Sequence, residues 1–450
     1  MKLSQYLGYG AGDAANNLTF STVSAFLLIY YTNVAGITAA AAGTLFLVVR
    51  IWGGFTDLFA GRRVDDTQTR WGKFRPYLLF GPVPLLVLLV AVFSIPGGLS
   101  LGGKLAWAYV SYALFQLAYS FVNIPYGSLS AAMTQLPDDR AKLSTSRSIA
   151  ASLTILLIAV AVSPQISGAG DLQRSLTITT AAFAIIGFAL YLWCFTTSRE
   201  TVRRDVETVG LRETLRMMRH NRPLVLLCTA TLVFLSGMFA QQTVAVYYAR
   251  DVLGNANYYI VLTVVSTAGM ILASALVPKA VEVVGKKRTF LVAGVIAAAS
   301  AVGFALAPRS APAIAFVCYG VLGIGLGAIN TLIFALQADT VDYGEWNSGI
   351  RAEGGSYSVL SFTRKTGQGI GGAVAAYTIG LGGYVSGAGT QTGSALTSIR
   401  VAAGFIPAAF ILAATAVMLV YPLTERAFRA IIAEMAERRA VAELQRPGTA

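Results

Sequence analysis

Apolar segments long enough to cross a membrane recur along the whole chain, and each break between them carries charged residues, proline or glycine. A spanning helix needs about 20 mostly apolar residues. The chain is 55% hydrophobic and 12% charged, whereas soluble domains carry about 25% charged residues. We therefore expect an all-α polytopic membrane protein with twelve transmembrane helices. The predicted spans are residues 8–32, 37–60, 76–96, 105–133, 147–167, 175–197, 223–248, 257–278, 288–307, 311–337, 355–383 and 399–422.

Lys and Arg residues gather in alternate loops. The amino terminus, the loops after even-numbered spans and the tail hold most of them, and the opposite loops hold Lys104, Arg174, Arg250, Arg309 and Arg400. Because cytoplasmic loops are rich in Lys and Arg, both termini are predicted to be cytoplasmic. The net charge of +13 reflects this topology. No nucleic-acid partner is expected, since a nucleic-acid binder gathers its basic residues on one soluble face.

The longest polar insertion between spans divides the chain into two predicted six-helix bundles. The expected divisions are an amino-terminal bundle at 1–197, a cytoplasmic linker at 198–222, a carboxy-terminal bundle at 223–423 and a cytoplasmic tail at 424–450. A Gly-Arg-Arg sequence at 61–63, after the second span, has a Gly-Lys-Lys-Arg counterpart at 285–288, after the eighth. Two related bundles leave a parallel repeat of this kind.

Two charged residues lie inside the second span. Arg50 and Asp57 are seven residues apart, which places them about two turns apart on one face of a helix. A charge at the bilayer centre costs about 2.5–3.5 kcal/mol, so such residues usually face a bundle interior or a wet cavity. One interpretation is an ion pair that locks two helices together, and the other is a site for a coupling cation. We expect Asp57 to engage Arg50.

Polar residues also interrupt the first and fourth spans. Asp13 follows a glycine-rich run and is predicted to accept hydrogen bonds from substrate hydroxyls, unless it lies at the wet cytoplasmic end of its helix. Asn123 and Tyr126 share a helix face beside Pro125. An amide and a phenol suit a polyhydroxy ligand, because each both donates and accepts hydrogen bonds. A proline kink with packed polar neighbours is the alternative.

Three further cations are candidates for a central cavity. Arg147 opens the fifth span, where it either faces the cavity or anchors the helix at the headgroups. Arg364 and Lys365 are adjacent in the eleventh span, so their side chains point about 100° apart. One is expected to face the substrate while the other pairs with a carboxylate. If the substrate carries a carboxylate, Arg364 is its preferred partner, since a guanidinium forms two parallel hydrogen bonds with a carboxylate.

Several kinds of site are not expected. Cys194, Cys228 and Cys318 lie far apart in apolar segments, and His220 has no histidine or cysteine nearby, so neither a disulfide nor a metal site is predicted. The glycines that follow Lys365 lack a preceding strand, which favours helix packing over nucleotide binding. Without a Walker sequence or a nucleophile–base pair, we expect neither an ATP-driven pump nor an enzyme, and no cofactor.

Long motifs in the chain resemble a known family of transporters. The segments RIWGGFTD, TRWGKFRPYLLFG, VNIPYGSL, ADTVDYGEW and IRAEGGSYSVLSFTRKTGQGIGG are similar to those of the glycoside-pentoside-hexuronide cation symporters, the melibiose-carrier family. The glycines and Asp57 at the end of the second span resemble the loop signature of the major facilitator superfamily. The resemblance covers residues 5–440 and is strongest to the bacterial glucuronide carriers. It implies two six-helix bundles of the major facilitator fold.

The resemblance also implies roles for individual residues. Asp13 corresponds to the family's sugar-binding aspartate, Arg147 to a sugar-pocket arginine and Lys365 to a lysine near the cation site. Asp57 corresponds to one of two cation-site aspartates, and the other falls on Gly53. Because paired carboxylates favour sodium, this departure favours a proton as the coupling ion.

Two other departures concern the sugar. Asn123 stands where the melibiose carrier has aspartate, and Gly127 stands where it has tryptophan. Both differences argue against galactoside recognition.

These patterns predict a secondary active transporter in a bacterial inner membrane. It is expected to import a glycoside, and specifically a glucuronide, together with a cation. The expected mechanism is alternating access. The expected partners are this small-molecule glycoside, the coupling cation (H⁺ in preference to Na⁺) and membrane lipid. The rivals are a sodium-coupled or uncoupled carrier of a neutral pentoside or galactoside, and a non-transporting membrane sensor. A sensor needs a soluble output domain, and the tail offers one short amphipathic helix.

Overall fold

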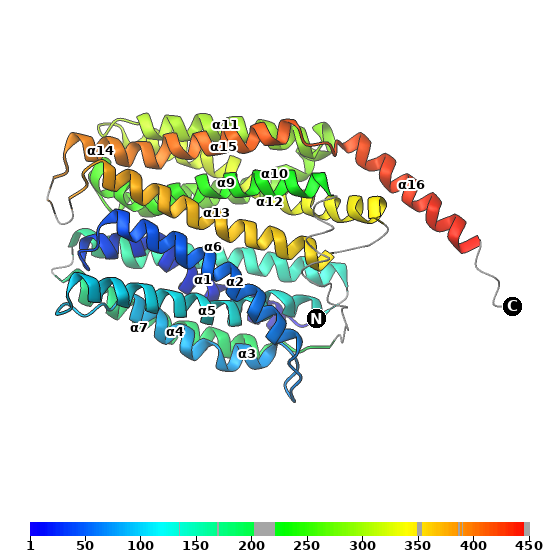
Figure 1. The fold of residues 1–450 in the computed structure, drawn as a ribbon, viewed down its shortest axis with the longest axis horizontal. Coiled ribbons are helices and arrows are strands. Elements are labelled where there is room, and N and C mark those ends of the chain that lie inside the picture. Colours follow the sequence, from blue (N-terminus) through cyan, green and yellow to red (C-terminus); the bar gives the residue numbers. More distant parts are fainter. Residues whose placement is uncertain are drawn as a thin grey trace.

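The computed structural model is almost entirely helical and describes residues 1–134, 136–168, 171–201, 221–348, 353–385, 388 and 390–444. Long helices run side by side along one axis, with α1–α7 in one half and α9–α15 in the other (Figure 1). The first six spans are α1 (Leu3–Asn33), α2 (Ala39–Asp65), α3 with α4 (Arg75–Phe80 and Pro82–Val92), α5 (Leu101–Met133), α6 (Pro137–Gly168) and α7 (Leu172–Thr197).

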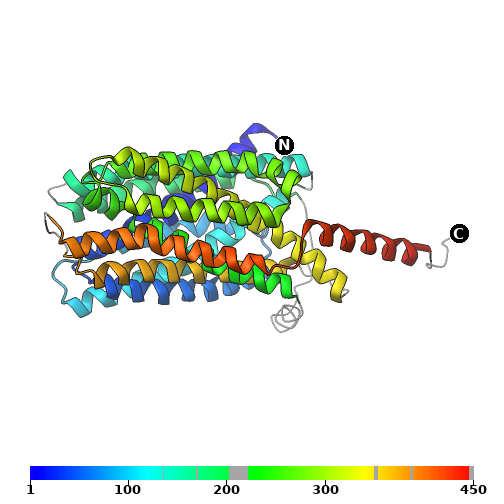
Figure 2. The same ribbon diagram turned by 90° about the horizontal axis from the view of Figure 1, so that it is seen from above.

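The second half repeats this number of spans. They are α9 with the π-helical turn η1 (Arg222–Tyr247 and Tyr248–Val252), α10 (Tyr258–Val284), α11 (Lys286–Leu306), α12 (Pro312–Ser348), α13 (Glu353–Leu381), and α14 with η2 and α15 (Gly393–Arg400, Val401–Phe405 and Ile406–Leu419). A last helix, α16 (Glu425–Leu444), projects from the end of the bundle (Figures 1 and 2). The twelve predicted spans and the two-bundle fold are confirmed. The domain boundaries stay a prediction, because most of the linker and His220 lie outside the described residues.

Some helices extend well beyond the predicted spans. The fifth begins at Pro137 rather than at residue 147, and the tenth ends at Ser348 rather than at residue 337. Hydropathy identifies only the lipid-crossing part of a helix, whereas its polar turns continue where they find partners. The Trp346 indole, for example, donates a hydrogen bond of 3.0 Å to Glu434 of α16. Arg147, predicted to open its span, therefore lies well inside α6.

Two of the spans do not reach the apolar length expected of a membrane helix, and both carry charged residues. Among the described residues, ten helical segments are long and apolar enough to cross a membrane by length and composition. The two other spans are α1, which contains Asp13, and α13, which contains Arg364 and Lys365. Helix α1 packs mainly on α7 and α6, and α13 packs on α9 and α2. Their polar residues thus face protein, as the cost of charge in lipid requires.

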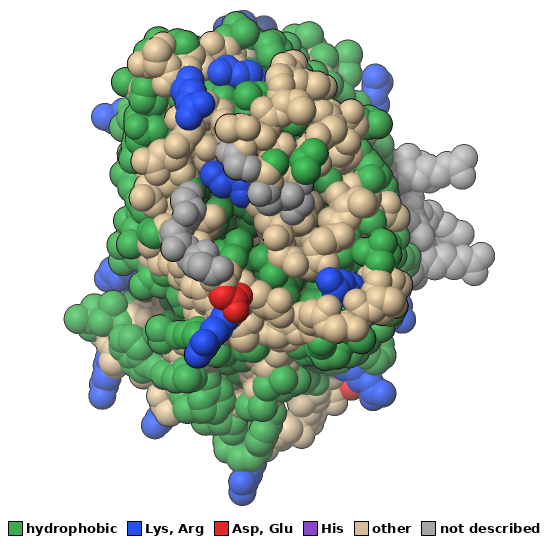
Figure 3. Space-filling view, turned by 90° about the vertical axis from the view of Figure 1, so that its left-hand side faces the viewer, with side chains coloured by type: hydrophobic (Ala, Val, Ile, Leu, Met, Phe, Trp, Pro, Cys, Tyr) green, Lys and Arg blue, Asp and Glu red, His purple; other side chains and the backbone are tan. Residues whose placement is uncertain are grey.

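At the end of the molecule opposite the termini, polar contacts join the two halves. The Thr32 hydroxyl lies 2.8 Å from the Tyr247 hydroxyl. The Tyr384 hydroxyl donates to Asn33 at 3.1 Å, and Arg250 donates to Tyr384. Figure 3 views this end of the molecule, where apolar side chains cover the flanks. The two halves are therefore closed against each other here.

The amino terminus and the last helix, α16, lie at the same end of the bundle (Figure 1), and the sidedness of that end is a testable prediction. Ser100→Cys, before α5, and Ser394→Cys, in α14, are exposed positions at the opposite end. Both are expected to react with an impermeant maleimide from outside the cell. Thr67→Cys and Val206→Cys should react only after permeabilisation, although Val206 lies outside the described residues.

The native protein is the control for this labelling. Two of its three cysteines are buried and the third is half-buried, so its background should be low. Inverted labelling would contradict the cytoplasmic assignment of the termini, which rests on the distribution of Lys and Arg.

Candidate functional site

An ion pair between α1 and α6 forms the first part of the site. The Arg147 Nε donates to Asp13 Oδ1 at 2.9 Å. The Asn17 amide, one turn along α1, donates to Asp13 Oδ2 at 3.0 Å. The Asp13 side chain is only 9% exposed, whereas that of Arg147 is 40% exposed. A buried carboxylate beside a partly open guanidinium offers both an acceptor and donors to sugar hydroxyls.

Tyr126 forms one wall of this cluster. Its ring stacks on Tyr9 with centroids 4.8 Å apart, and the Arg147 guanidinium lies 5.2 Å from its centroid. Its hydroxyl donates to the Tyr9 carbonyl at 2.8 Å, so the fold already uses that group. A Cβ on Gly12 would lie 2.5 Å from the Tyr126 ring, which explains why a glycine lets α1 approach so closely. Tyr126 is 0% exposed, so in this structure it packs against the ion pair and presents neither its hydroxyl nor a free ring face to a ligand.

Asn123 and Gly127 lie on α5 beside Tyr126. Asn123 is half-buried, and its side chain makes no hydrogen bond within the part of the chain that the structure describes. Pro125 lies inside the helix, which continues to Met133. A Cβ on Gly127 would meet nothing within 4 Å. The absence of a side chain at Gly127 therefore leaves open space next to Tyr126.

A second ion pair joins the two halves. The Lys365 Nζ of α13 lies 2.6 Å from Asp57 Oδ2 of α2, and it also donates to the Gly53 carbonyl at 3.2 Å. Both side chains are about 90% shielded, with 11% and 12% exposed. Asp57 Oδ1 is buried and makes no hydrogen bond among the described residues. One oxygen of this carboxylate is thus available to an incoming proton or cation.

The expected pairing of Arg50 with Asp57 is wrong. Seven residues of helix advance about 10 Å along the axis, so the two side chains must both bend toward each other to meet. The Lys365 ammonium reaches Asp57 directly from the facing helix, and Arg50 bonds elsewhere. The ion pair therefore locks α2 to α13, across the two halves, and not within α2.

Gly53 marks the place where the resemblance implies a second carboxylate. A Cβ on Gly53 would lie 2.5 Å from the amide nitrogen of Gln116. That nitrogen is buried, and Gln116 is 1% exposed. An amide donor thus occupies the space of an acidic side chain. Among the described residues, no group of three or more His, Cys, Asp or Glu side chains is placed to hold a metal ion.

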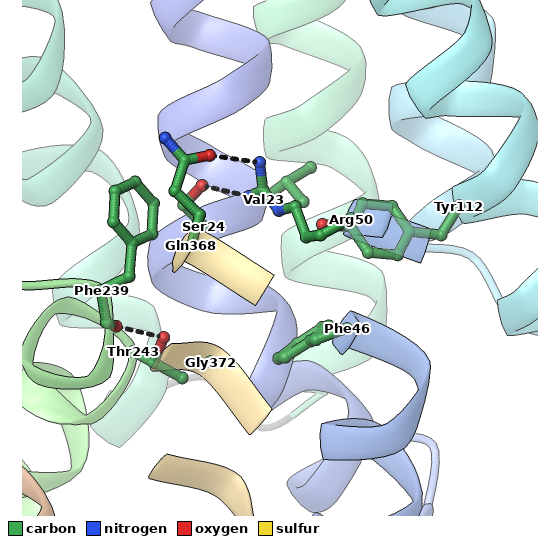
Figure 4. Close-up of a pocket in the computed structure, with 9 residues that line it drawn as sticks. All are labelled: Val23, Ser24, Phe46, Arg50, Tyr112, Phe239, Thr243, Gln368 and Gly372. Atoms are coloured by element: carbon green, nitrogen blue, oxygen red, sulfur yellow. Dashed lines mark hydrogen bonds between the residues drawn. The ribbon is translucent and has the colours of Figure 1, made fainter. Parts of the chain in front are cut away.

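Arg50 lies in a small cleft between the two halves (Figure 4). Its Nη1 donates to Gln368 Oε1 at 3.2 Å and its Nη2 donates to Ser24 Oγ at 3.0 Å. The guanidinium lies 4.8 Å from the Phe20 centroid and 5.9 Å from that of Phe239. Such contacts orient a guanidinium and stabilise its charge.

Arg364 lies on a different side of α13 from Lys365. Its Nη1 donates to Asn330 of α12 at 3.3 Å, and its guanidinium lies 4.9 Å from the Phe334 centroid. The structure therefore brings Arg364 to α12, whereas Lys365 meets α2.

Aromatic residues connect the two charged clusters. Phe20 stacks on Tyr119 with centroids 5.7 Å apart and meets Phe239 edge-on at 6.2 Å. The Tyr119 phenol is within electrostatic reach of the charges on α1, α2 and α6. Sequence reasoning missed Tyr119, because an aromatic residue in an apolar span carries no polar signal.

Three polar residues of the site were also missed. Ser24 and Gln368 line the cleft and accept hydrogen bonds from Arg50, and the amide of Gln116 lies against Gly53. Gln368 lies in the glycine run after Lys365, and its position one turn beyond Arg364 was the available signal. Single amides and hydroxyls in membrane spans more often serve as contacts between helices, which hides their role.

The chain matches the family described as MFS/sugar transport protein over residues 8–425. The chain belongs to this family. A glucuronide carrier protein homolog of Escherichia coli (strain K12) is 42% identical over 438 residues, which cover 97% of this chain and 96% of that relative. An isoprimeverose transporter of Lactiplantibacillus pentosus is 32% identical over 414 residues, covering 90% of this chain and 85% of its own.

Solved structures show the same fold at low identity. The nucleoside transporter NupG has a TM-score of 0.67 at 11% identity and covers 93% of this chain and 100% of its own. A bacterial homolog of the lysosomal transporter Spinster has a TM-score of 0.65 at 12% identity, covering 96% and 98%.

The protein is thus a multi-pass membrane transporter of the sugar type and not an enzyme. The resemblance to the melibiose-carrier family is confirmed. The specific sugar, the coupling ion and the roles of individual residues stay predictions.

Proposed function

We propose that the protein imports a glucuronide together with a proton across a bacterial inner membrane, with both termini in the cytoplasm. The observation that carries the proposal is the presence of two buried ion pairs with different positions in the fold. Asp13 and Arg147 pair within the first half, and Asp57 and Lys365 pair across the two halves. The Asp13–Arg147 pair suits the binding of a polyhydroxy substrate. The Asp57–Lys365 pair suits the coupling of proton binding to movement of the two halves. The similarity to a glucuronide carrier homolog supports this choice of sugar.

The pair across the halves supplies a physical route for coupling. Asp57 and Lys365 attract each other only while the carboxylate is charged. A proton bound to Asp57 neutralises it, weakens its bond to Lys365 and so loosens α2 from α13. Release of the proton restores the attraction. Proton binding and rocking of the two halves are linked by this difference in interaction.

The immediate surroundings of Asp57 favour a proton over sodium. The Lys365 ammonium already lies 2.6 Å from one carboxylate oxygen. Gly53 contributes no second carboxylate, and the amide nitrogen of Gln116 fills that space with a donor. A sodium ion needs several oxygen ligands, whereas a proton needs one carboxylate oxygen.

An uptake panel in membrane vesicles tests the proposed function. Radiolabelled phenyl glucuronide and phenyl glucoside are compared under imposed pH and sodium gradients. We expect the glucuronide to accumulate when the outside is acidic and the interior is neutral, and sodium at constant pH to have no effect. Vesicles without the protein are the control.

Two results would contradict the proposal. Accumulation of the glucoside but not the glucuronide would favour a neutral glycoside, in line with the isoprimeverose transporter among the relatives. Strong stimulation by sodium at constant pH would favour the sodium-coupled alternative.

A further inference from the structure

Among the residues that the structure describes, the buried cation Arg50 has no anionic partner. It is 5% exposed, and within the described ranges no carboxylate lies within 4 Å of its guanidinium. The carboxylate of Asp57, on the same helix, pairs with Lys365 through its Oδ2. An uncompensated charge in the interior of a protein is strongly destabilising. A buried, unpaired guanidinium therefore indicates that something else supplies the negative charge.

The neutral partners of Arg50 fix the orientation of its guanidinium but do not neutralise its charge or use all of its hydrogen-bond donors. The Ser24 hydroxyl and the Gln368 carbonyl accept one hydrogen bond each from the two Nη atoms. A guanidinium has five N–H donors, so further donors stay available. In Figure 4 the side chain of Arg50 lies in the cleft, with the Phe239 ring on one side and Tyr112 on the other. The cleft thus contains a positively charged guanidinium that is held in a fixed orientation.

The other cations of the central region are already engaged. Arg147 pairs with Asp13 and Lys365 pairs with Asp57. Arg364 reaches α12, where it contacts Asn330 and Phe334. Arg50 is therefore the cation best placed to receive a negative group from a ligand.

We propose that Arg50 binds the carboxylate of the transported sugar, with Gln368 and Ser24 holding the guanidinium in position. A planar guanidinium grips a carboxylate with two parallel hydrogen bonds. The inference rests on the proposed function, because it needs an anionic glycoside as substrate. It assigns to Arg50 a role in sugar selection, whereas the sequence suggested a role in cation coupling and assigned the carboxylate to Arg364.

Arg50 and Asp13 lie at different levels of the central region. Ser24, the partner of Arg50, is eleven residues after Asp13, so Ser24 and Asp13 lie about three turns apart on one face of α1. Phe20 and Tyr119 pack between these levels.

Equilibrium binding to the purified full chain, without any ion gradient, tests the role of Arg50. The probes are 4-nitrophenyl glucuronide and 4-nitrophenyl glucoside, which differ only in the carboxylate. Loss of one partner of a buried charge pair is costly, so Arg50→Gln is expected to weaken glucuronide binding about 100-fold. Glucoside binding is expected to change no more than about threefold. The glucuronide affinity of Arg50→Lys should lie between these values, because lysine keeps the positive charge but cannot form two parallel hydrogen bonds.

Arg364→Gln is the matched control, since it removes the same group from the same region. It is expected to leave the ratio of the two affinities unchanged. Equal losses for both sugars in Arg50→Gln, or a selective loss of glucuronide in Arg364→Gln, would overturn the proposal. Should Arg50→Gln fail to yield folded protein by gel filtration, Arg50→Lys carries the same comparison.

The wild-type protein separates this inference from the proposed function. If the wild type does not bind the glucuronide, the proposed substrate is wrong and Arg50 loses its proposed ligand as well. If the wild type binds it and Arg50→Gln keeps the same selectivity, only the role of Arg50 is wrong.

Discussion

Asp57→Asn is expected to abolish concentrative uptake of the substrate while exchange across the membrane continues. Asparagine has the shape of aspartate but binds no proton in this range, and it cannot form the ion pair with Lys365. Without coupling, the ratio of internal to external substrate should fall to about one at steady state. Vesicle uptake under an imposed pH gradient measures accumulation, and counterflow without a gradient measures exchange.

A second Lys–Asp pair provides a matched control for this substitution. Lys286 of α11 lies 2.7 Å from Asp339 of α12, and both helices belong to the same half. Asp339→Asn is expected to lower the amount of folded protein but to leave accumulation by the remaining molecules coupled to the proton. Full accumulation by Asp57→Asn would remove Asp57 from coupling. Equal loss of accumulation in both variants would show that any buried Lys–Asp pair is required.

Asp13→Asn is expected to weaken the binding of glucuronide and glucoside alike, by about 100-fold or more. The substitution removes an anionic acceptor and leaves Arg147 without its counterion, and loss of one partner from such a pair costs about 3–5 kcal/mol. Both probes share the hydroxyls that Asp13 is proposed to bind, so the loss should not depend on the carboxylate. Binding to the purified protein measures both affinities.

Two further variants separate a role in binding from a role in packing. Asp171→Asn alters an exposed carboxylate that caps α7, and it should leave both affinities unchanged. The double variant Asp13→Asn/Arg147→Gln removes both charges of the pair. If the double variant recovers sugar binding, the pair only holds α1 to α6 and does not touch the substrate. A loss confined to the glucuronide would place its carboxylate near Arg147 instead of near Arg50.

Variants of Asp13 and Arg50 are expected to have different effects on sugar binding, which lets the experiments distinguish the two roles. One variant should reduce affinity for both sugars, and the other should reduce affinity only for the anionic sugar. The Asp57 variant should leave binding largely intact and remove accumulation. Three buried charged residues within one central region are thus expected to produce three distinguishable defects.

The number of spans was determined by the sequence, because a bilayer imposes a minimum apolar length on each helix. The polar interruptions in the first and eleventh spans were equally visible, and they identified α1 and α13 as helices that face protein. The sequence did not predict helix ends such as Ser348, since they depend on hydrogen bonds to residues far away in the sequence, such as the one from Trp346 to Glu434.

The partners of the charged residues were decided only by the tertiary structure. Arg50 and Asp57 are close in sequence and lie on one helix, yet the ammonium that reaches Asp57 comes from Lys365, more than 300 residues away. Spacing along one helix determines which face a side chain occupies, but the helix packed against that face determines what it meets. For this reason the sequence alone identified the charged residues, and only the packing of α2 against α13 decided that Arg50 meets no carboxylate within the described part of the chain.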